Sequence, residues 1–255
     1  MGIVTEEQGS VWEEMAAKHG VIAEIHPLDY LFDFLFKNES FPTKAQAIRY
    51  YFDDGADSAR QLHDLLTRVC GLADTRFRML EFAAGYGLVT RHLPKLFPRA
   101  TITSCDIHRS AVRFLEEKIG VQGLLSKTVP EEFVAPTNYD VVFALAFFSS
   151  MPKTTWSRWL ERLWDAVAEG GFMIFTTQGR KSAVYYEAVK LDEDGFWFAP
   201  LSEQKDLSTE DYGQAIVHPR YVIGQVLGRA DRELTLFHEG AWWRHQDLYV
   251  LRKTA

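Results

Sequence analysis

The clearest chemical signal in this sequence is an acidic residue followed by a run of small residues. Glu81 ends an apolar run, and Phe82-Ala83-Ala84-Gly85-Tyr86-Gly87 follows it. A second apolar run, 101–105, ends on Asp106, nineteen residues after Gly87. Small residues let the backbone approach a ligand, and an acid ending the second strand of a βαβ unit can accept hydrogen bonds from both ribose hydroxyls. The pattern therefore predicts a nucleoside-containing cofactor.

The spacing of the glycines argues against a nicotinamide dinucleotide. That pattern, G-x-G-x-x-G, needs a third glycine, whereas Leu88, Val89 and Thr90 follow Gly87. The loop could also be an ordinary turn and Asp106 an ordinary turn residue, since Asp is common in turns. The combination of the two features favours a cofactor site, and an NAD-linked oxidoreductase is the less favoured interpretation.

The hydrophobic pattern indicates the elements that position these residues. Up to about residue 72 it is helical: we expect helices over 11–18 and 43–52, an aromatic segment over 28–36, a turn at 53–55 and a further helix from Ser58 to Gly71. From residue 77 the pattern predicts strands over 77–82, 101–105, 123–125, 139–143 and 172–177, with helices over 90–97, 110–119 and 156–168 between them. Alternating strands and helices indicate a mostly parallel sheet covered on both faces.

The C-terminal part of the chain follows a different order. We expect a helix over 182–191, a polar and aromatic insertion over 192–211 and a helix over 220–227. The last two apolar runs, 234–243 and 247–252, are separated by only a few residues. They must pair antiparallel, because a parallel crossover needs about a dozen residues or more.

Five β/α units closed by an antiparallel hairpin resemble the class I S-adenosylmethionine (SAM)-dependent methyltransferases. The likeness is strongest at residues 81–87, which are similar to the family's acid-x-Gly-x-Gly-x-Gly pattern. Ala83 replaces the first glycine, so we expect an ordinary backbone conformation there. The resemblance implies an α/β, Rossmann-like, seven-stranded mostly parallel sheet with a C-terminal antiparallel hairpin and an N-terminal helical cap.

The resemblance also implies which residues bind the cofactor. Glu81 would lie near the amino group of SAM, the glycines under its ribose and methionine parts, and Asp106 on the ribose hydroxyls. Ile107 and Val129 would contact adenine, and Ala144 would lie beside the sulfonium. The full set of expected cofactor residues is Glu81, Phe82, Ala83, Gly85, Gly87, Asp106, Ile107, Val129, Ala144 and Tyr51, the last from the cap.

The methyl acceptor is less clearly indicated. An oxygen acceptor of high pKa needs a general base, and His245, Glu239 and His218 are the candidates, although each could be an ordinary structural polar group. The nucleobase-methylating branch of the family carries Asn/Asp-Pro-Pro-aromatic after its fourth strand. Here that position reads Ala-Leu-Ala-Phe-Phe (144–148), which disfavours DNA or RNA as the substrate.

The composition excludes several other classes of protein. The 255 residues carry 35 acidic and 28 basic side chains, a net charge of −7, which argues against nucleic acid as a partner. The two cysteines form no C-x-x-C pair, so no metal site is expected. Residues 1–10 lack the apolar core of a signal peptide, and no apolar run approaches the roughly 20 residues of a membrane span. We therefore expect a cytoplasmic protein without a membrane partner.

These observations together predict a SAM-dependent methyltransferase for a small or medium organic acceptor, with oxygen favoured over nitrogen and S-adenosylhomocysteine (SAH) as product. The alternative is a non-catalytic SAM- or SAH-binding regulatory protein. The expected domains are a helical cap over 1–72 and a methyltransferase domain over 73–255, in which 191–220 forms a lid or substrate insertion. The sequence sets no expectation for the oligomeric state or the identity of the acceptor.

Overall fold

The computed structural model describes residues 6–202 and 204–255. Nine strands lie in the described residues: β1 (Arg78–Phe82), β2 (Thr101–Asp106), β3 (Gln122–Leu125), β4 (Tyr139–Ala144), β5 (Val167–Gln178), β6 (Phe196–Ala199), β7 (Gln214–Val217), β8 (Arg232–Trp242) and β9 (Gln246–Lys253). Seven of them form one sheet in the order β3-β2-β1-β4-β5-β9-β8, and β6 and β7 form a separate pair. The predicted Rossmann-like, mostly parallel sheet with its C-terminal antiparallel hairpin is therefore confirmed.

The chain divides into two compact units, each built from two stretches of sequence. The first unit comprises Met1–Arg76 and Ala84–Leu125, and the second comprises Phe77–Ala83 and Ser126–Ala255. Strand β1 and the segment that follows it thus belong to different units. Each unit has its own buried side chains and is described separately.

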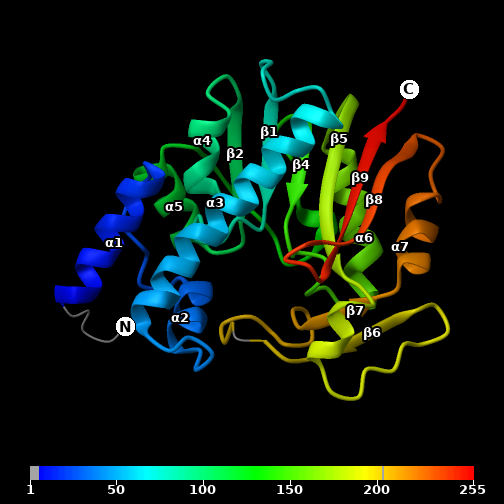
Figure 1. Cartoon of the computed structure of the whole chain (residues 1–255). Helices are drawn as coiled ribbons and strands as arrows, with labels where there is room; N and C mark the ends of the chain where they lie inside the picture. Colours follow the sequence, from blue (N-terminus) through cyan, green and yellow to red (C-terminus); the bar gives the residue numbers. More distant parts are fainter. Residues whose placement is uncertain (1–5, 203) are drawn as a thin grey trace. The chain divides into compact units, whose positions relative to one another are not determined.

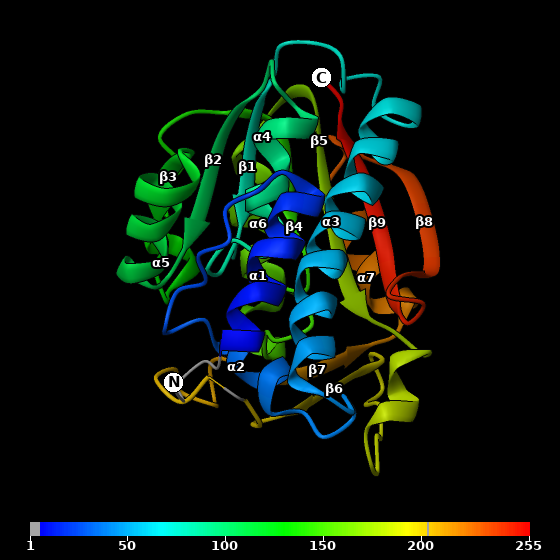
Figure 2. The same ribbon diagram turned by 60° about the vertical axis from the view of Figure 1, so that its left-hand side comes forward.

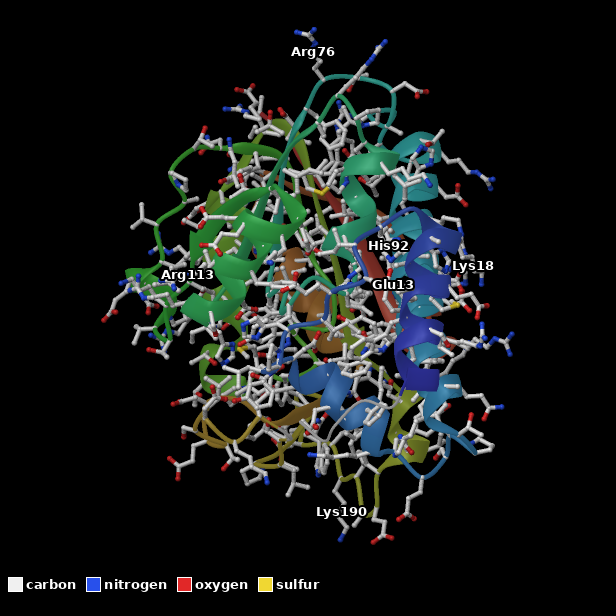
Figure 3. The ribbon with its side chains drawn as sticks, turned by 90° about the vertical axis from the view of Figure 1, so that its left-hand side faces the viewer. Glu13, Lys18, Arg76, His92, Arg113 and Lys190 are labelled. Carbon is white, nitrogen blue, oxygen red and sulfur yellow. The ribbon has the colours of Figure 1, made fainter. Side chains whose placement is uncertain are left out.

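The first unit consists of helices and the parallel pair of strands β2 and β3. Its helical elements are α1 (Glu6–His19), α2 (Tyr30–Lys37), α3 (Lys44–Arg68), α4 (Leu93–Leu96) and α5 (Arg109–Phe114), with short helical turns η1 (Thr90–His92) and η2 (Leu115–Ile119). Both α1 and α2 contact α3, and Figure 2 shows α1 running beside it. In Figure 3, Lys18 extends outward from α1 and Arg113 from α5, whereas His92 lies inward next to α1.

Helix α3 corrects one prediction. The turn expected at 53–55 and the helix start expected at Ser58 are wrong, because α3 continues unbroken through Gly55. It begins at Thr43, whose side chain accepts a hydrogen bond from the Gln46 backbone while the Gln46 side chain bonds back to Thr43. A Cβ at Gly55 would lie 2.2 Å from the Leu88 carbonyl oxygen. The glycine there serves close packing rather than a turn.

The second unit contains the other five strands of the large sheet. β1 pairs in parallel with β4 and β4 with β5, while β9 lies antiparallel between β5 and β8. Figure 1 shows these strands side by side, with α6 (Lys153–Asp165) and α7 (Pro219–Val226) beside them. Helix α6 has one apolar face, whose members are all buried: Trp156, Trp159, Leu160, Leu163 and Trp164.

Two element boundaries in this unit differ from expectation. α6 ends at Asp165 rather than at residue 168, and β5 begins at Val167 rather than at residue 172. Within this stretch Gly170 has a φ of +73°, a left-handed conformation that glycine adopts at low cost. The helix expected over 182–191 is reduced to the short turn η4 (Ser182–Tyr185). The segment expected to be an insertion contributes β6 and β7, which pair antiparallel.

Candidate cofactor and acceptor site

The loop after β1 has an unusual backbone. Ala83, Gly85 and Gly87 have φ values of +59°, +56° and +84°, all in the left-handed region. The expected ordinary conformation at Ala83 is therefore wrong: alanine holds a conformation that glycine adopts at lower cost. Ala83 is exposed and Gly85 half-buried, so the backbone of this loop is accessible.

The two glycines of the loop serve different purposes. No atom lies within 4 Å of a Cβ built at Gly85, so this position faces open space. A Cβ built at Gly87 would lie 2.4 Å from Cδ1 of Ile119, in the turn that follows α5. Gly87 thus allows close packing inside the first unit, whereas Gly85 leaves room for a ligand to approach the backbone.

Asp106 lies where the sequence predicts it, as the last residue of β2, and it is 6% exposed. Its Oδ2 accepts a hydrogen bond from the Gly85 backbone N–H at 2.8 Å. Its Oδ1 accepts one from the His108 backbone N–H and lies 2.9 Å from His108 Nδ1. The carboxylate is thereby fixed beside the glycine loop, with lone pairs left for further donors. This arrangement fits a ribose diol.

Aromatic residues of the N-terminal segment surround this corner of the first unit. The His26 ring stacks on Tyr86 with centroids 4.5 Å apart, and the Tyr30 ring lies 5.9 Å from that of His108. Neither contact was predicted from the sequence. Aromatic side chains in the 28–36 segment were the available signal, but their partners are distant in sequence.

A buried polar group connects the N-terminal helices to the glycine loop. Arg91 is 5% exposed, and its Nε donates to the Gly87 carbonyl at 2.9 Å, while one of its terminal nitrogens lies 3.3 Å from the Tyr51 hydroxyl. That hydroxyl donates to Asp29 Oδ2 at 2.6 Å, and burial raises the pKa of Asp29. The hydroxyl of Tyr51 is thus engaged within the first unit, and a role for it on the cofactor stays a prediction.

Part of the chain is similar to known methyltransferases. Residues 80–173 match the family model described as a methyltransferase domain. The malonyl-[acyl-carrier protein] O-methyltransferase of Halalkalibacterium halodurans is 32% identical over 108 residues, 40% of this chain and 39% of that protein. This segment of the chain is similar to the methyltransferase domain family.

Solved structures of methyltransferases share the fold. The complex of DhpI with SAH has a TM-score of 0.55 at 18% identity, covering 88% of this chain and 96% of that one. SAM-bound CalS10, an amino pentose methyltransferase from Micromonospora echinaspora, has a TM-score of 0.57 at 13% identity, covering 86% and 99%. Against the curated relatives, in contrast, the match spans 36% to 54% of their length.

The segment after β4, residues 145–152, follows Ala144, which we expected to lie beside the sulfonium of SAM. Ala144 is fully buried, and Ala146 has a φ of +56°. The Ala146 N–H donates to Thr176 Oγ1 at 2.9 Å, and this hydroxyl donates to Gln246 Oε1 at 2.7 Å. The two buried side chains hold the segment in its unusual conformation. Neither Thr176 nor Gln246 was predicted from the sequence.

The three candidate general bases are all engaged with neighbouring groups. His218 caps α7, because its Nδ1 accepts from the Arg220 N–H at 3.1 Å, and burial lowers its pKa. Glu239 lies 2.8 Å from Arg180, which lowers the pKa of this carboxyl. His245 Nδ1 lies 3.0 Å from Ser182 Oγ, and burial lowers the pKa of His245. None is an obviously poised base.

The pKa of the Asp247 carboxyl is raised, whereas that of Glu239 is lowered. Asp247 is fully buried, its Oδ1 accepts from the Gly240 N–H at 2.8 Å, and burial raises its pKa to about 6. Its Oδ2 has no hydrogen-bond partner among the described residues.

The remaining predicted cofactor residues are spread over both units. Glu81 and Phe82 are buried at the end of β1, Ile107 is half-buried directly after Asp106, and Val129 is 39% exposed before the turn η3 (Pro130–Glu132). Their contacts with SAM stay predictions.

Among the described residues no group of three or more His, Cys, Asp or Glu side chains could hold a metal ion. No helix in residues 6–202 and 204–255 has the length and apolar character of a membrane span.

Proposed function

We propose that this protein transfers a methyl group from SAM to an oxygen of a small or medium organic acid, with a carboxylate as the accepting group. Support comes from the methyltransferase model over residues 80–173 and from curated relatives that are named O-methyltransferases of malonyl-[acyl-carrier protein]. The names of those relatives give a malonyl group as part of their substrate, and we propose a similar carboxylate as the acceptor here.

The Asp106 carboxylate is the observation that carries the cofactor assignment. It is 6% exposed, ends β2, and is held by the Gly85 N–H beside open space above the loop. Lone pairs on a fixed, buried carboxylate are suited to a pair of ribose hydroxyls. SAM, when bound, supplies a methyl group activated by its positive sulfur, so this chain has mainly to align the acceptor and exclude water.

A carboxylate acceptor also agrees with the state of the candidate bases. An alcohol needs a base to remove its proton, whereas a carboxylic acid, with a pKa near 4, is already ionised at neutral pH. His218, Glu239 and His245 are each engaged in contacts that compete with proton abstraction. The proposed reaction needs none of them.

Calorimetric titration with SAM and SAH tests the cofactor assignment. We expect micromolar binding by the unaltered protein and binding weaker by about 10- to 100-fold for Asp106→Asn, which removes charge-assisted hydrogen bonds with little change of shape. Asp57→Ala serves as control, since Asp57 is exposed on α3 and, within the described part of the chain, pairs with Arg60 alone. Equal SAM affinity in Asp106→Asn and the control would contradict the ribose assignment.

Turnover distinguishes an enzyme from the alternative of a non-catalytic SAM-binding protein. We retain that alternative because the candidate bases His218, Glu239 and His245 are each bonded to neighbouring groups. The protein is incubated with methyl-labelled SAM and a panel of free carboxylates, malonyl thioesters, alcohols and amines. We expect labelled methyl esters from the carboxylate group of the panel. Transfer to amines alone would contradict the oxygen assignment, and SAM binding without any transfer would favour the regulatory protein.

We further propose that residues 191–220 form a lid beside the acceptor and that residues 1–72 form a cap. The lid is anchored inside the second unit by Lys153, whose Nζ lies 2.6 Å from carboxylate oxygens of both Asp192 and Asp194. A cytoplasmic location and the absence of a nucleic-acid partner stay predictions of the sequence.

A further inference from the structure

Two glutamines and a tyrosine meet at the carboxyl end of β5. Gln178 is the last residue of β5, Gln214 the first of β7, and Tyr186 directly follows η4. Gln178 Nε2 donates to Gln214 Oε1 at 3.0 Å, and the Tyr186 hydroxyl donates to the same oxygen at 2.8 Å. We call these three residues the glutamine cluster. All of them belong to the second unit.

The cluster lies next to the segment that follows β4. Gln178 is two residues beyond Thr176, so both side chains lie on the same face of the sheet, and Thr176 Oγ1 accepts from the Ala146 N–H at 2.9 Å. β7 is attached to the same segment, since the N–H groups of Gly213 and Ala215 donate to the Ser150 and Ser149 carbonyls at 2.9 and 2.8 Å. Figure 1 shows β7 beyond the end of β5. Ligands of open α/β sheets bind at the carboxyl ends of strands.

The hydrogen bonds within the cluster fix which atoms it presents. Because Gln214 Oε1 accepts from two donors, the Gln214 amide is held with its NH₂ group directed away from both. The described residues offer no partner to Gln214 Nε2 or to Gln178 Oε1. The cluster therefore offers both N–H bonds of Gln214 and the second N–H of Gln178, against one carbonyl oxygen. An excess of donors suits a ligand rich in acceptors.

The surroundings of the cluster are partly closed to water. Gln178 is 6% exposed, Gln214 and Tyr186 are half-buried, and the Trp197 ring of β6 lies 5.8 Å from that of Tyr186. Hydrogen bonds to a charged group in such surroundings are stronger than those at an open surface. No acidic side chain takes part in the cluster, so it would not repel an anion.

We propose that the Gln214 amide, held in place by Gln178 and Tyr186, binds the carboxylate of the methyl acceptor. This proposal rests on the proposed function and names the residue that recognises its substrate. It assigns to the lid a selectivity for acidic acceptors over neutral ones. A purely structural cluster would attach β7 to β5 without distinguishing between acceptors.

Calorimetry on the SAH-saturated protein tests the proposal without requiring turnover. The probes are malonyl-N-acetylcysteamine, which carries the carboxylate, and acetyl-N-acetylcysteamine, which lacks it. We expect the unaltered protein to bind the malonyl probe at least about 10-fold more tightly, as hydrogen bonds to a charged group allow. Gln214→Leu should remove this preference, and Gln214→Glu should reverse it by repulsion. SAH affinity should stay unchanged in both variants.

Gln204→Leu is the matched control, because Gln204 belongs to the same lid and its side chain, among the described residues, bonds to Tyr212 alone, at 3.3 Å. It should keep the preference for the malonyl probe. If Gln214→Leu fails to fold, as judged by its melting temperature, Gln214→Asn keeps the amide but shortens its reach and should still weaken malonyl binding.

The outcomes separate this proposal from the proposed function. A wild-type preference for the malonyl probe that persists in Gln214→Leu overturns the cluster assignment alone. Equal binding of both probes by the wild-type protein, or binding of neither, overturns the carboxylate acceptor and the cluster assignment together. Equal loss of malonyl, acetyl and SAH binding in Gln214→Leu would show a structural role and also overturn the assignment.

Discussion

At the scale of single residues, the two glycines after β1 make separable contributions. Gly85→Ala places a methyl group in open space at a φ of +56°, so we expect it to cost only about 1 kcal/mol of stability but to weaken SAM binding more than tenfold. Gly87→Ala meets Ile119 at a φ of +84° and should cost about 2 kcal/mol. Urea denaturation and SAM calorimetry on both variants check this. Unchanged SAM affinity in Gly85→Ala would contradict the ligand-facing role.

His92 should make the stability of the protein sensitive to acid. Burial, helped by Arg91, lowers its pKa from 6.5 to about 3. Between these values the unfolded chain binds a proton that the folded protein excludes, so stability falls as the pH drops from 6.5 toward 3, by up to about 1.4 kcal/mol per pH unit. His92→Phe removes this group while keeping an aromatic ring against His19.

The measurement for His92 is the urea-unfolding free energy at several pH values from 7 to 4. The slope of stability against pH should be shallower in His92→Phe than in the unaltered protein, whatever the absolute stability of the variant. Identical slopes in the two proteins would show that His92 is not held neutral in the folded state.

At the scale of elements, two helical glycines should respond oppositely to the same substitution. Gly55 in α3 lies so close to Leu88 that a Cβ would be 2.2 Å from a backbone oxygen, which cannot easily move. Gly55→Ala should therefore cost about 1–3 kcal/mol despite the better helix propensity of alanine. Gly224 in α7 faces open space, so Gly224→Ala should add about 0.5–1 kcal/mol. Thermal unfolding measures both, and a stabilised Gly55→Ala would refute the packing argument.

Elements also show how far local patterns predict structure. Short apolar runs between turn residues predict the strands and their alternation with helices. Asp106 ends β2 as expected. Asp53-Asp54-Gly55 has the composition of a turn, but helix α3 runs through it because its apolar residues on either side are buried. Composition indicates the backbone conformation that a segment prefers in isolation, and here packing overrides that preference.

At the scale of the whole molecule, the division into units has a consequence for truncation. Helices α1–α3 belong to the same compact unit as residues 84–125, and Ile48, Tyr51 and Phe52 of α3 are fully buried. We expect a fragment of residues 73–255 to lose SAM binding and to lack a sharp unfolding transition, because Arg91, Leu93 and the glycine loop lose their packing. Circular dichroism melting and calorimetry check this, and cooperative unfolding with normal SAM affinity would contradict it.

The sequence by itself determined the class of fold and the place of the small-residue loop after β1. Both depend on local features, since an apolar run, a small-residue turn and a strand-ending acid occupy one continuous stretch of about thirty residues, 78–106. The tertiary structure decided the left-handed φ of Ala83, the link from Arg91 to Tyr51, and the meeting of Gln178, Gln214 and Tyr186. These features join residues far apart in the chain or oppose a local preference, so only packing and hydrogen bonding in the folded protein could establish them.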